Sequence, residues 1–167
     1  MRQITAPENT EYSTLEKVRA KLRAMGLQEP EKPEGDTYPE CPLDLSSIGG
    51  DAVTTLQQEF NRWYGWVSYA NAVADEAAKE WASGIRLLEK TLIKKEGMSK
   101  DETELDLRII AMRHTQQLFS QEATLTGVHK SILDRYLKAT SRVIEVIRMN
   151  LERGRRGGNM GMPPWKD

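Results

Sequence analysis

The sequence predicts an all-α protein built on a long antiparallel helical hairpin with coiled-coil-like packing. Apolar residues recur at spacings of three and four over residues 53 to 92, the period of a helix with a partner along its whole length. Most of residues 105 to 146 show the same spacing. Only a few residues separate the two segments, and so short a turn makes the two helices antiparallel neighbours. The first stripe comprises Val53, Leu56, Phe60, Trp63, Val67, Ala70, Ala74, Ala77, Trp81, Ile85, Leu88 and Leu92.

A short amphipathic helix is expected first, over residues 13 to 25. Ser13 and Glu16 have the spacing of a capping box, and Gly26 is a stop signal. Residues 28 to 50 then contain four prolines and three glycines, so they should form an extended arm. The apolar residues of this arm either lie against the helices or a neighbouring subunit, or stay solvated; they are Tyr38, Leu43, Leu45 and Ile48.

The long helix is expected from near Asp51 to Glu96, ending at Gly97. Ser99 and Glu102 form a second capping box, which should open the returning helix, and Gly127 marks a kink or break in it. The stripe of the returning helix is Leu105, Ile109, Met112, Gln116, Phe119, Leu125, Val128, Ile132, Tyr136, Ala139, Val143 and Val146.

A second stripe on the returning helix widens its apolar face beyond what one partner helix can cover. A third helix or another subunit should bury it, and oligomerisation is the economical answer. The stripe consists of Leu133, Leu137, Ile144, Ile147 and Leu151.

Three parts follow from this pattern: a short helix with an extended arm (1–50), a helical hairpin that oligomerises (51–152) and a basic Arg/Gly tail (153–167). The tail begins Arg-Gly-Arg-Arg-Gly-Gly, a composition that continues a helix poorly.

Composition argues against several classes of protein. The chain has one cysteine, Cys41, and its two histidines, His114 and His129, have no ligand-type spacing, so no metal site or other cofactor is expected. No motif offers a nucleophile or a phosphate-binding loop, so the protein is not expected to be an enzyme. No membrane span or signal peptide is expected either, which favours the cytoplasm.

Charge is distributed unevenly along the chain. Residues 130 to 167 carry nine basic and four acidic side chains, whereas the preceding residues are acidic on balance. A basic end predicts an anionic partner, nucleic acid first and a membrane surface next, with self-association between opposite ends as the plainer alternative. The basic side chains are Arg135, Lys138, Arg142, Arg148, Arg153, Arg155 and Arg156.

Tryptophan and tyrosine residues near the start of the long helix are more typical of a subunit interface than of base stacking. Together with the second stripe they define the candidate oligomerisation residues. These are Trp63, Trp66, Leu133, Tyr136, Leu137, Ile144 and Ile147.

An Arg-Trp pair near the start of a long helix, a charged turn and a return helix with a basic end resemble the phage recombination mediators of the UvsY type. Residues 123 to 147 look like the oligomerisation region of that family. Its basic Leu-Lys-Ala-Arg-Leu motif corresponds here to residues 85 to 89, so the resemblance implies that Arg86 contacts DNA. Leu88 stands at the second basic position, where Lys90 or the C-terminal arginines would have to substitute.

The resemblance implies a ring-like homo-oligomer that binds single-stranded DNA and helps a phage recombinase displace the single-strand-binding protein. If the source is viral, it would act in the host cytoplasm. The alternative is a phage structural, scaffold or adaptor protein that assembles through its helices and its N-terminal arm. An inhibitor of some host protein is a third possibility.

Overall fold

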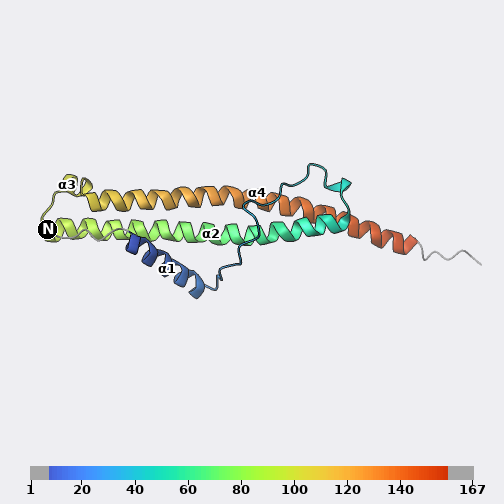
Figure 1. Cartoon of the computed structure of the whole chain (residues 1–167), viewed down its shortest axis with the longest axis horizontal. Coiled ribbons are helices and arrows are strands. Elements are labelled where there is room, and N and C mark those ends of the chain that lie inside the picture. The colour runs from blue at the N-terminus through green and yellow to red at the C-terminus, as the bar shows by residue number, and fades with distance from the viewer. Residues whose placement is uncertain (1–7, 158–167) are drawn as a thin grey trace, which may run out of the picture. The chain divides into compact units, whose positions relative to one another are not determined.

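The computed structural model describes residues 8–157, and in that range every regular element is helical, without a strand. The all-α prediction is therefore confirmed. Figure 1 gives the order of the elements, which are α1 (Glu8–Ala24), η1 (Leu45–Ser47), α2 (Gly50–Thr91), η2 (Leu92–Glu96), α3 (Lys100–Glu104) and α4 (Leu107–Gly157).

Helix α1 ends where the sequence predicts and begins earlier. The N–H of Leu27 donates to the carbonyl of Leu22, and that of Gly26 to the carbonyl of Arg23, while Gly26 has φ +85°. This is a Schellman motif, in which glycine adopts the left-handed conformation at low cost. Ser13, however, lies inside the helix, because residues 8 to 12 contain no glycine or proline to stop it.

Two caps at the end of α2 confirm the predicted turn. Helical structure continues through η2 to Gly97, which adopts a left-handed φ of +69°. Ser99 and Glu102 then form the expected capping box, with the Ser99 N–H donating to Oε2 of Glu102 at 2.7 Å and the Glu102 N–H to Oγ of Ser99 at 3.2 Å.

The capping box opens only the short helix α3, contrary to the prediction of one continuous returning helix. Asp106 starts a new helix because its Oδ1 accepts the N–H of Arg108 at 2.8 Å, as an N-terminal cap does. The guanidinium of Arg108 bonds the same carboxylate and holds the pKa of Asp106 below its usual range. The chain therefore breaks at residues 105–106 before α4 begins.

Helix α4 is longer than the sequence predicts. It passes through Gly127 without a break and continues to Gly157, so residues 153–157 are helical rather than the start of a non-helical tail. Arginine is a good helix former, and an isolated glycine costs a helix only about 1 kcal/mol, which the preceding turns offset. The rest of the predicted tail, from residue 158, lies outside the described residues.

The chain divides into two compact units. Unit 1 comprises residues 1–31 and 65–130, and unit 2 comprises residues 32–64 and 131–167. Helices α2 and α4 each contribute a segment to both units. In unit 1 these segments run antiparallel and are joined through η2 and α3 (Figure 1).

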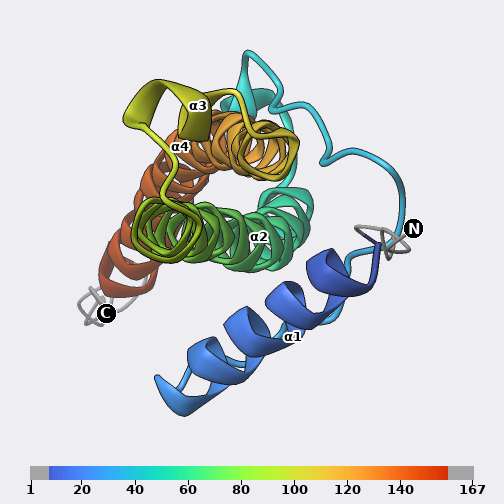
Figure 2. The same cartoon turned by 90° about the vertical axis from the view of Figure 1, so that its left-hand side faces the viewer.

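Unit 1 contains two apolar clusters. In one, Val18 and Leu22 of α1 pack on Tyr69 and Ala77 of α2. In the other, Ile85 of α2 and Leu92 of η2 meet Ile109 of α4. Figure 2 shows α1 lying beside α2. The short helix therefore covers a face of α2.

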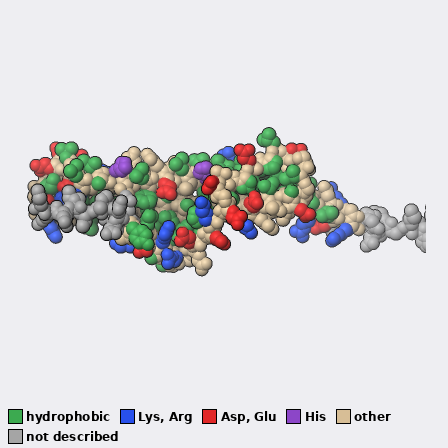
Figure 3. Space-filling model, viewed as in Figure 1, with side chains coloured by type: hydrophobic (Ala, Val, Ile, Leu, Met, Phe, Trp, Pro, Cys, Tyr) green, Lys and Arg blue, Asp and Glu red, His purple; other side chains and the backbone are tan. Residues whose placement is uncertain are grey.

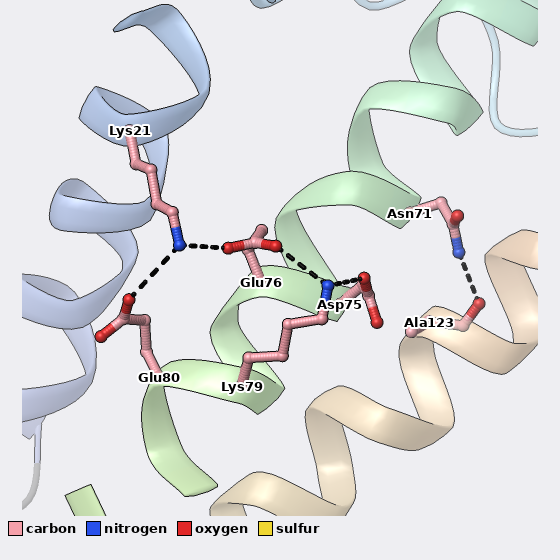
Figure 4. Close-up of polar contacts among 7 residues, drawn as sticks. All are labelled: Lys21, Asn71, Asp75, Glu76, Lys79, Glu80 and Ala123. Atoms are coloured by element: carbon pink, nitrogen blue, oxygen red, sulfur yellow. Dashed lines mark hydrogen bonds and ion pairs between the residues drawn. The ribbon is translucent and has the colours of Figure 1, made fainter. Parts of the chain in front are cut away.

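Polar contacts fix the helices of unit 1 against one another (Figure 4). Nζ of Lys21 on α1 lies 2.6 Å from Oε2 of Glu76 and 3.7 Å from Oε1 of Glu80 on α2. Nδ2 of Asn71 donates to the carbonyl of Ala123 at 2.6 Å and to Oγ1 of Thr126 at 3.1 Å. The Asn71 bonds set both the rotation and the register of α4 in this unit.

The face of α4 that is buried differs from the predicted stripe in its middle and at its ends. Leu105, Leu125, Val128 and Val146 are exposed, although we expected them in the apolar contact. One series of buried and half-buried positions follows a regular alternation of three and four: Ile109, Met112, Gln116, Phe119, Ala123, Thr126 and Lys130 in unit 1, and Leu133, Leu137, Thr140, Ile144 and Ile147 in unit 2. In unit 2, Ile132, Tyr136, Ala139 and Val143 of the predicted stripe are half-buried as well.

The second stripe is thus mostly the packed face of α4 in unit 2, and only Leu151 of that stripe is exposed. Two apolar series with the same spacing coexist on one helix. In the middle of α4, polar residues such as Thr126 and Lys130 occupy the packed face, whereas the predicted stripe there followed the exposed Leu125 and Val128.

Candidate nucleic-acid interface

The predicted basic side chains of α4 lie on the unit 2 segment of the helix. Arg135, Lys138 and Arg142 are exposed and are separated by three and four residues on a continuous helix, so they share one face. Arg148, Arg153 and Arg155 are also exposed further along. With a rise of about 1.5 Å per residue, the span from Arg135 to Arg155 covers roughly 30 Å of helix. We call these six side chains the basic track.

The side chains of the basic track are largely available for ligands. Nζ of Lys138 lies 2.6 Å from Oδ2 of Asp134, and Nε of Arg148 lies 3.2 Å from Oε1 of Glu152. Such exposed pairs contribute little free energy and exchange readily for another anion. Arg135 and Arg142 form no ion pair with any residue in the described range.

An aromatic cluster beneath the track fixes the rotation of α4 in unit 2. The ring of Tyr136 lies 5.2 Å from that of Phe60 and 6.3 Å from that of Tyr38, and Tyr38 lies 6.2 Å from Trp63. Tyr136 is turned inward, and the neighbouring Arg135 is exposed. A further bond, from Nε2 of Gln57 to Oγ of Ser141 at 2.7 Å, ties α2 to α4 next to Arg142.

Residues 32–49 form the arm, and some of its apolar side chains pack in unit 2 while others stay in contact with solvent. Tyr38 enters the aromatic cluster and Leu45 is buried, whereas Leu43 is fully exposed. Burial raises the pKa of the Tyr38 hydroxyl. The sequence indicated these residues as candidates for docking but gave no means to choose among them.

Arg86 and Lys90, the residues that the family resemblance implies, lie on α2 in unit 1. Both are exposed and four residues apart, so they share a face. Leu88 instead packs against the cluster of Ile85, Leu92 and Ile109. The second basic position of the family motif is therefore occupied here by a side chain that supports the apolar core.

The side chain of Arg156 lies outside the described residues, as does Trp165. The candidate interface that the structure brings together is therefore the basic track of unit 2, with Arg86 and Lys90 as a separate basic pair in unit 1.

Several candidate oligomerisation residues pack against other residues of the same chain. Trp63 and Leu133 are buried, and Tyr136 packs on Phe60. Trp66, Leu137, Ile144 and Ile147 are half-buried. Trp63 and Leu133 leave little exposed surface in this structure, so their role in a subunit interface stays a prediction.

Side chains that could together hold a metal ion do not gather within the described range. No cluster of three or more His, Cys, Asp or Glu side chains suited to a metal occurs within residues 8–157. Cys41 is half-buried, and burial raises the pKa of its thiol, which lowers the thiolate fraction. His114 and His129 are exposed on α4.

No helix within residues 8–157 combines the length and apolar character of a membrane span. No protein-family model matches this chain, and comparisons with curated proteins and with solved structures also found no match.

Proposed function

We propose that the protein is a non-enzymatic recombination mediator that binds single-stranded DNA, assists recombinase loading and acts as a homo-oligomer in the cytoplasm. The observation that supports the proposal best is the basic track, in which Arg135, Arg142 and Arg153 share an exposed face of α4 with the weakly paired Lys138. Arg148 and Arg155 add exposed positive charge on the other side of the same helix. Flexible arginine and lysine side chains in a row neutralise the phosphates of a strand whose shape varies.

Recombinase loading and displacement of a single-strand-binding protein enter the proposal through the resemblance to mediators of the UvsY type. Arg86 and Lys90 would add phosphate contacts in unit 1. The proposal for DNA binding rests on the basic track alone and is tested first.

The test is fluorescence anisotropy of a labelled single-stranded oligonucleotide at low and moderate salt, with double-stranded DNA as competitor. We expect submicromolar, salt-sensitive binding that favours the single strand. Absence of binding at low salt would refute the proposal.

A charge-matched pair of variants localises the site. Replacing Arg135, Arg142, Arg148 and Arg153 with Gln should weaken binding and reduce the salt slope by about 0.7 for each phosphate that is no longer neutralised. The control replaces four exposed basic residues elsewhere, Lys17, Arg23, Lys94 and Lys100, with Gln. Equal reductions in affinity in the two variants would mean that net charge, and not the basic track, governs binding.

The alternative function, a structural, scaffold or adaptor protein, is favoured by one observation. Several large apolar side chains of α4 are exposed, as an assembly surface requires. Deleting residues 1–50 should abolish assembly if the arm straps a neighbour. The mediator should keep its oligomeric state and much of its DNA affinity in the same deletion.

A further inference from the structure

The outer face of α4 in unit 1 carries a row of exposed apolar side chains. Leu107, Ile110, Leu118, Leu125 and Val128 are 80%, 45%, 51%, 62% and 54% exposed. The Asn71 bonds to Ala123 and Thr126 turn the opposite face of α4 toward α2, so the row faces away from the packed side. We call it the outer stripe. Figure 3 shows hydrophobic side chains and the two histidines along the α4 side of this unit.

Around Leu118, Leu125 and Val128 the outer stripe is almost without charge, whereas Arg108 and Arg113 lie near its other end. Between His114 and His129, Glu122 is the only Asp, Glu, Lys or Arg, whereas such residues make up 29% of the whole chain. Most of the other polar residues of this segment are Gln, Ser and Thr. Solvated helix faces ordinarily carry many charges, and depletion of charge is the compositional mark of the centre of a protein–protein interface.

The order of residues along the stripe indicates what covers it. The two residues at each end of the stripe are spaced symmetrically about a midpoint between Gln117 and Leu118, so Leu118 lies at the centre. Laid antiparallel on a second copy about that midpoint, Leu107 meets Val128 and Ile110 meets Leu125. His114 and Gln121 lie closer to the midpoint and are also symmetric about it. In the antiparallel pair, the imidazole of His114 would therefore meet the side-chain amide of Gln121, and both groups can form hydrogen bonds.

We propose that the outer stripe of unit 1 is an antiparallel, two-fold interface with a second copy of this chain. An isologous interface of this kind closes as a dimer, whereas a ring requires head-to-tail contacts, so the inference goes beyond the proposed mediator function. It does not involve the basic track and requires no DNA.

The oligomeric state tests the interface. Sedimentation equilibrium of the full chain without DNA, from micromolar to near-millimolar concentration, should show a monomer–dimer equilibrium. Replacing Leu118 and Leu125 with Glu should raise the dissociation constant on the order of a hundredfold, since charges would be buried without partners. A matched control places the same two charges at Leu87 and Ile93, which are exposed outside α4 in unit 1, and should leave the constant unchanged.

Circular dichroism separates loss of association from loss of folding. Because Leu118 and Leu125 are exposed, the variant should retain the helical signal of the unmodified chain. A monomer throughout the concentration series, or a folded Leu118/Leu125 variant that associates as strongly as the unmodified chain, would overturn the proposal.

Crosslinking tests the antiparallel register. In a Cys41→Ser background, a short bismaleimide should join Ile110→Cys to Leu125→Cys when the two variants are mixed. Ile110→Cys alone should not crosslink, because its two copies would lie about 22 Å apart along the paired helices. Crosslinking of Ile110→Cys to itself, without the mixed product, would indicate a parallel pair and refute the two-fold arrangement.

Discussion

Asn71 has a structural role that its residue type alone does not reveal. Its side-chain amide is half-buried on α2 and donates hydrogen bonds to both Ala123 and Thr126 of α4. Asn71→Ala leaves the Ala123 carbonyl without this donor, so we expect a loss of about 1–3 kcal/mol in the free energy of unfolding, measured by urea denaturation.

A control on the same helix distinguishes this role from a general effect of removing asparagine. Asn61 is exposed, and Asn61→Ala should change the stability by less than about 0.5 kcal/mol. Equal effects of the two substitutions would argue against a specific role for Asn71.

The candidate site was largely predictable at the level of single residues. Exposure is the default for arginine and lysine, so spacing alone placed Arg135, Lys138 and Arg142 together. The fate of apolar residues was harder to predict. Leu125 and Leu133 are the same residue type, but Leu125 is exposed and Leu133 is buried. Which face of α4 is packed near Leu125 depends on the hydrogen bonds from Asn71 to Ala123 and Thr126, which lie 52 and 55 positions further along the chain.

At the scale of elements, α1 is held on α2 partly by charge. The ammonium of Lys21, followed by that of Lys79, bonds Glu76 and lowers the pKa of its carboxyl below the ordinary value of 4.5. A carboxyl whose pKa is lower in the folded state than in the unfolded state stabilises the docked helix at pH values above its ordinary pKa. This contribution is lost as the pH falls from the ordinary pKa through the lowered one. Acidification through pH 4.5 and below should therefore loosen α1.

Hydrogen exchange of the α1 amides provides the measurement. Exchange, corrected for its intrinsic pH dependence, should accelerate in α1 below pH 4.5 relative to the amides of α2. Glu76→Gln should exchange faster at neutral pH and lose part of the acid response. A corrected rate that does not depend on pH in the unmodified chain would contradict the electrostatic contribution.

The arm is a second element whose position depends on few contacts. Tyr38→Ala removes two ring contacts from the aromatic cluster of unit 2, so the arm should open more often and become more sensitive to protease. Limited proteolysis with identification of cleavage sites within residues 28–50 provides the measurement. Leu43→Ala is the control, since Leu43 is fully exposed and should leave the cleavage rate unchanged.

Helix boundaries were predictable where local chemistry decides them. Gly26 and Gly97 end helices as expected, and the Ser99 capping box begins a helix, although only the short α3. The predicted Ser13 cap lies inside α1, because nothing before it stops the helix. The break before α4 was missed because the Asp106 cap depends on how its side chain turns, and not on a spacing that distinguishes it from other acidic residues.

At the scale of the whole molecule, the outer stripe links stability to concentration. A ligand that binds only the folded state stabilises it by mass action, and a second copy of the chain acts in the same way. The melting temperature should therefore rise with protein concentration. The Leu118/Leu125→Glu variant should melt at one temperature across the series; a melting point of the unmodified chain that does not vary would argue against association in the folded state.

The bonds between Asn71 and α4 also limit how the hairpin can change its length. They join the two helices at one level, and the packed face of α4 repeats every seven residues on either side of that level. An insertion in one helix alone, between this level and the turn, would carry Asn71 away from Ala123 or force the turn to bulge. Paired insertions of seven residues, one in each helix, would preserve the contact. A hairpin with this contact can therefore change its length without losing the contact only in whole heptads, with both helices changing together.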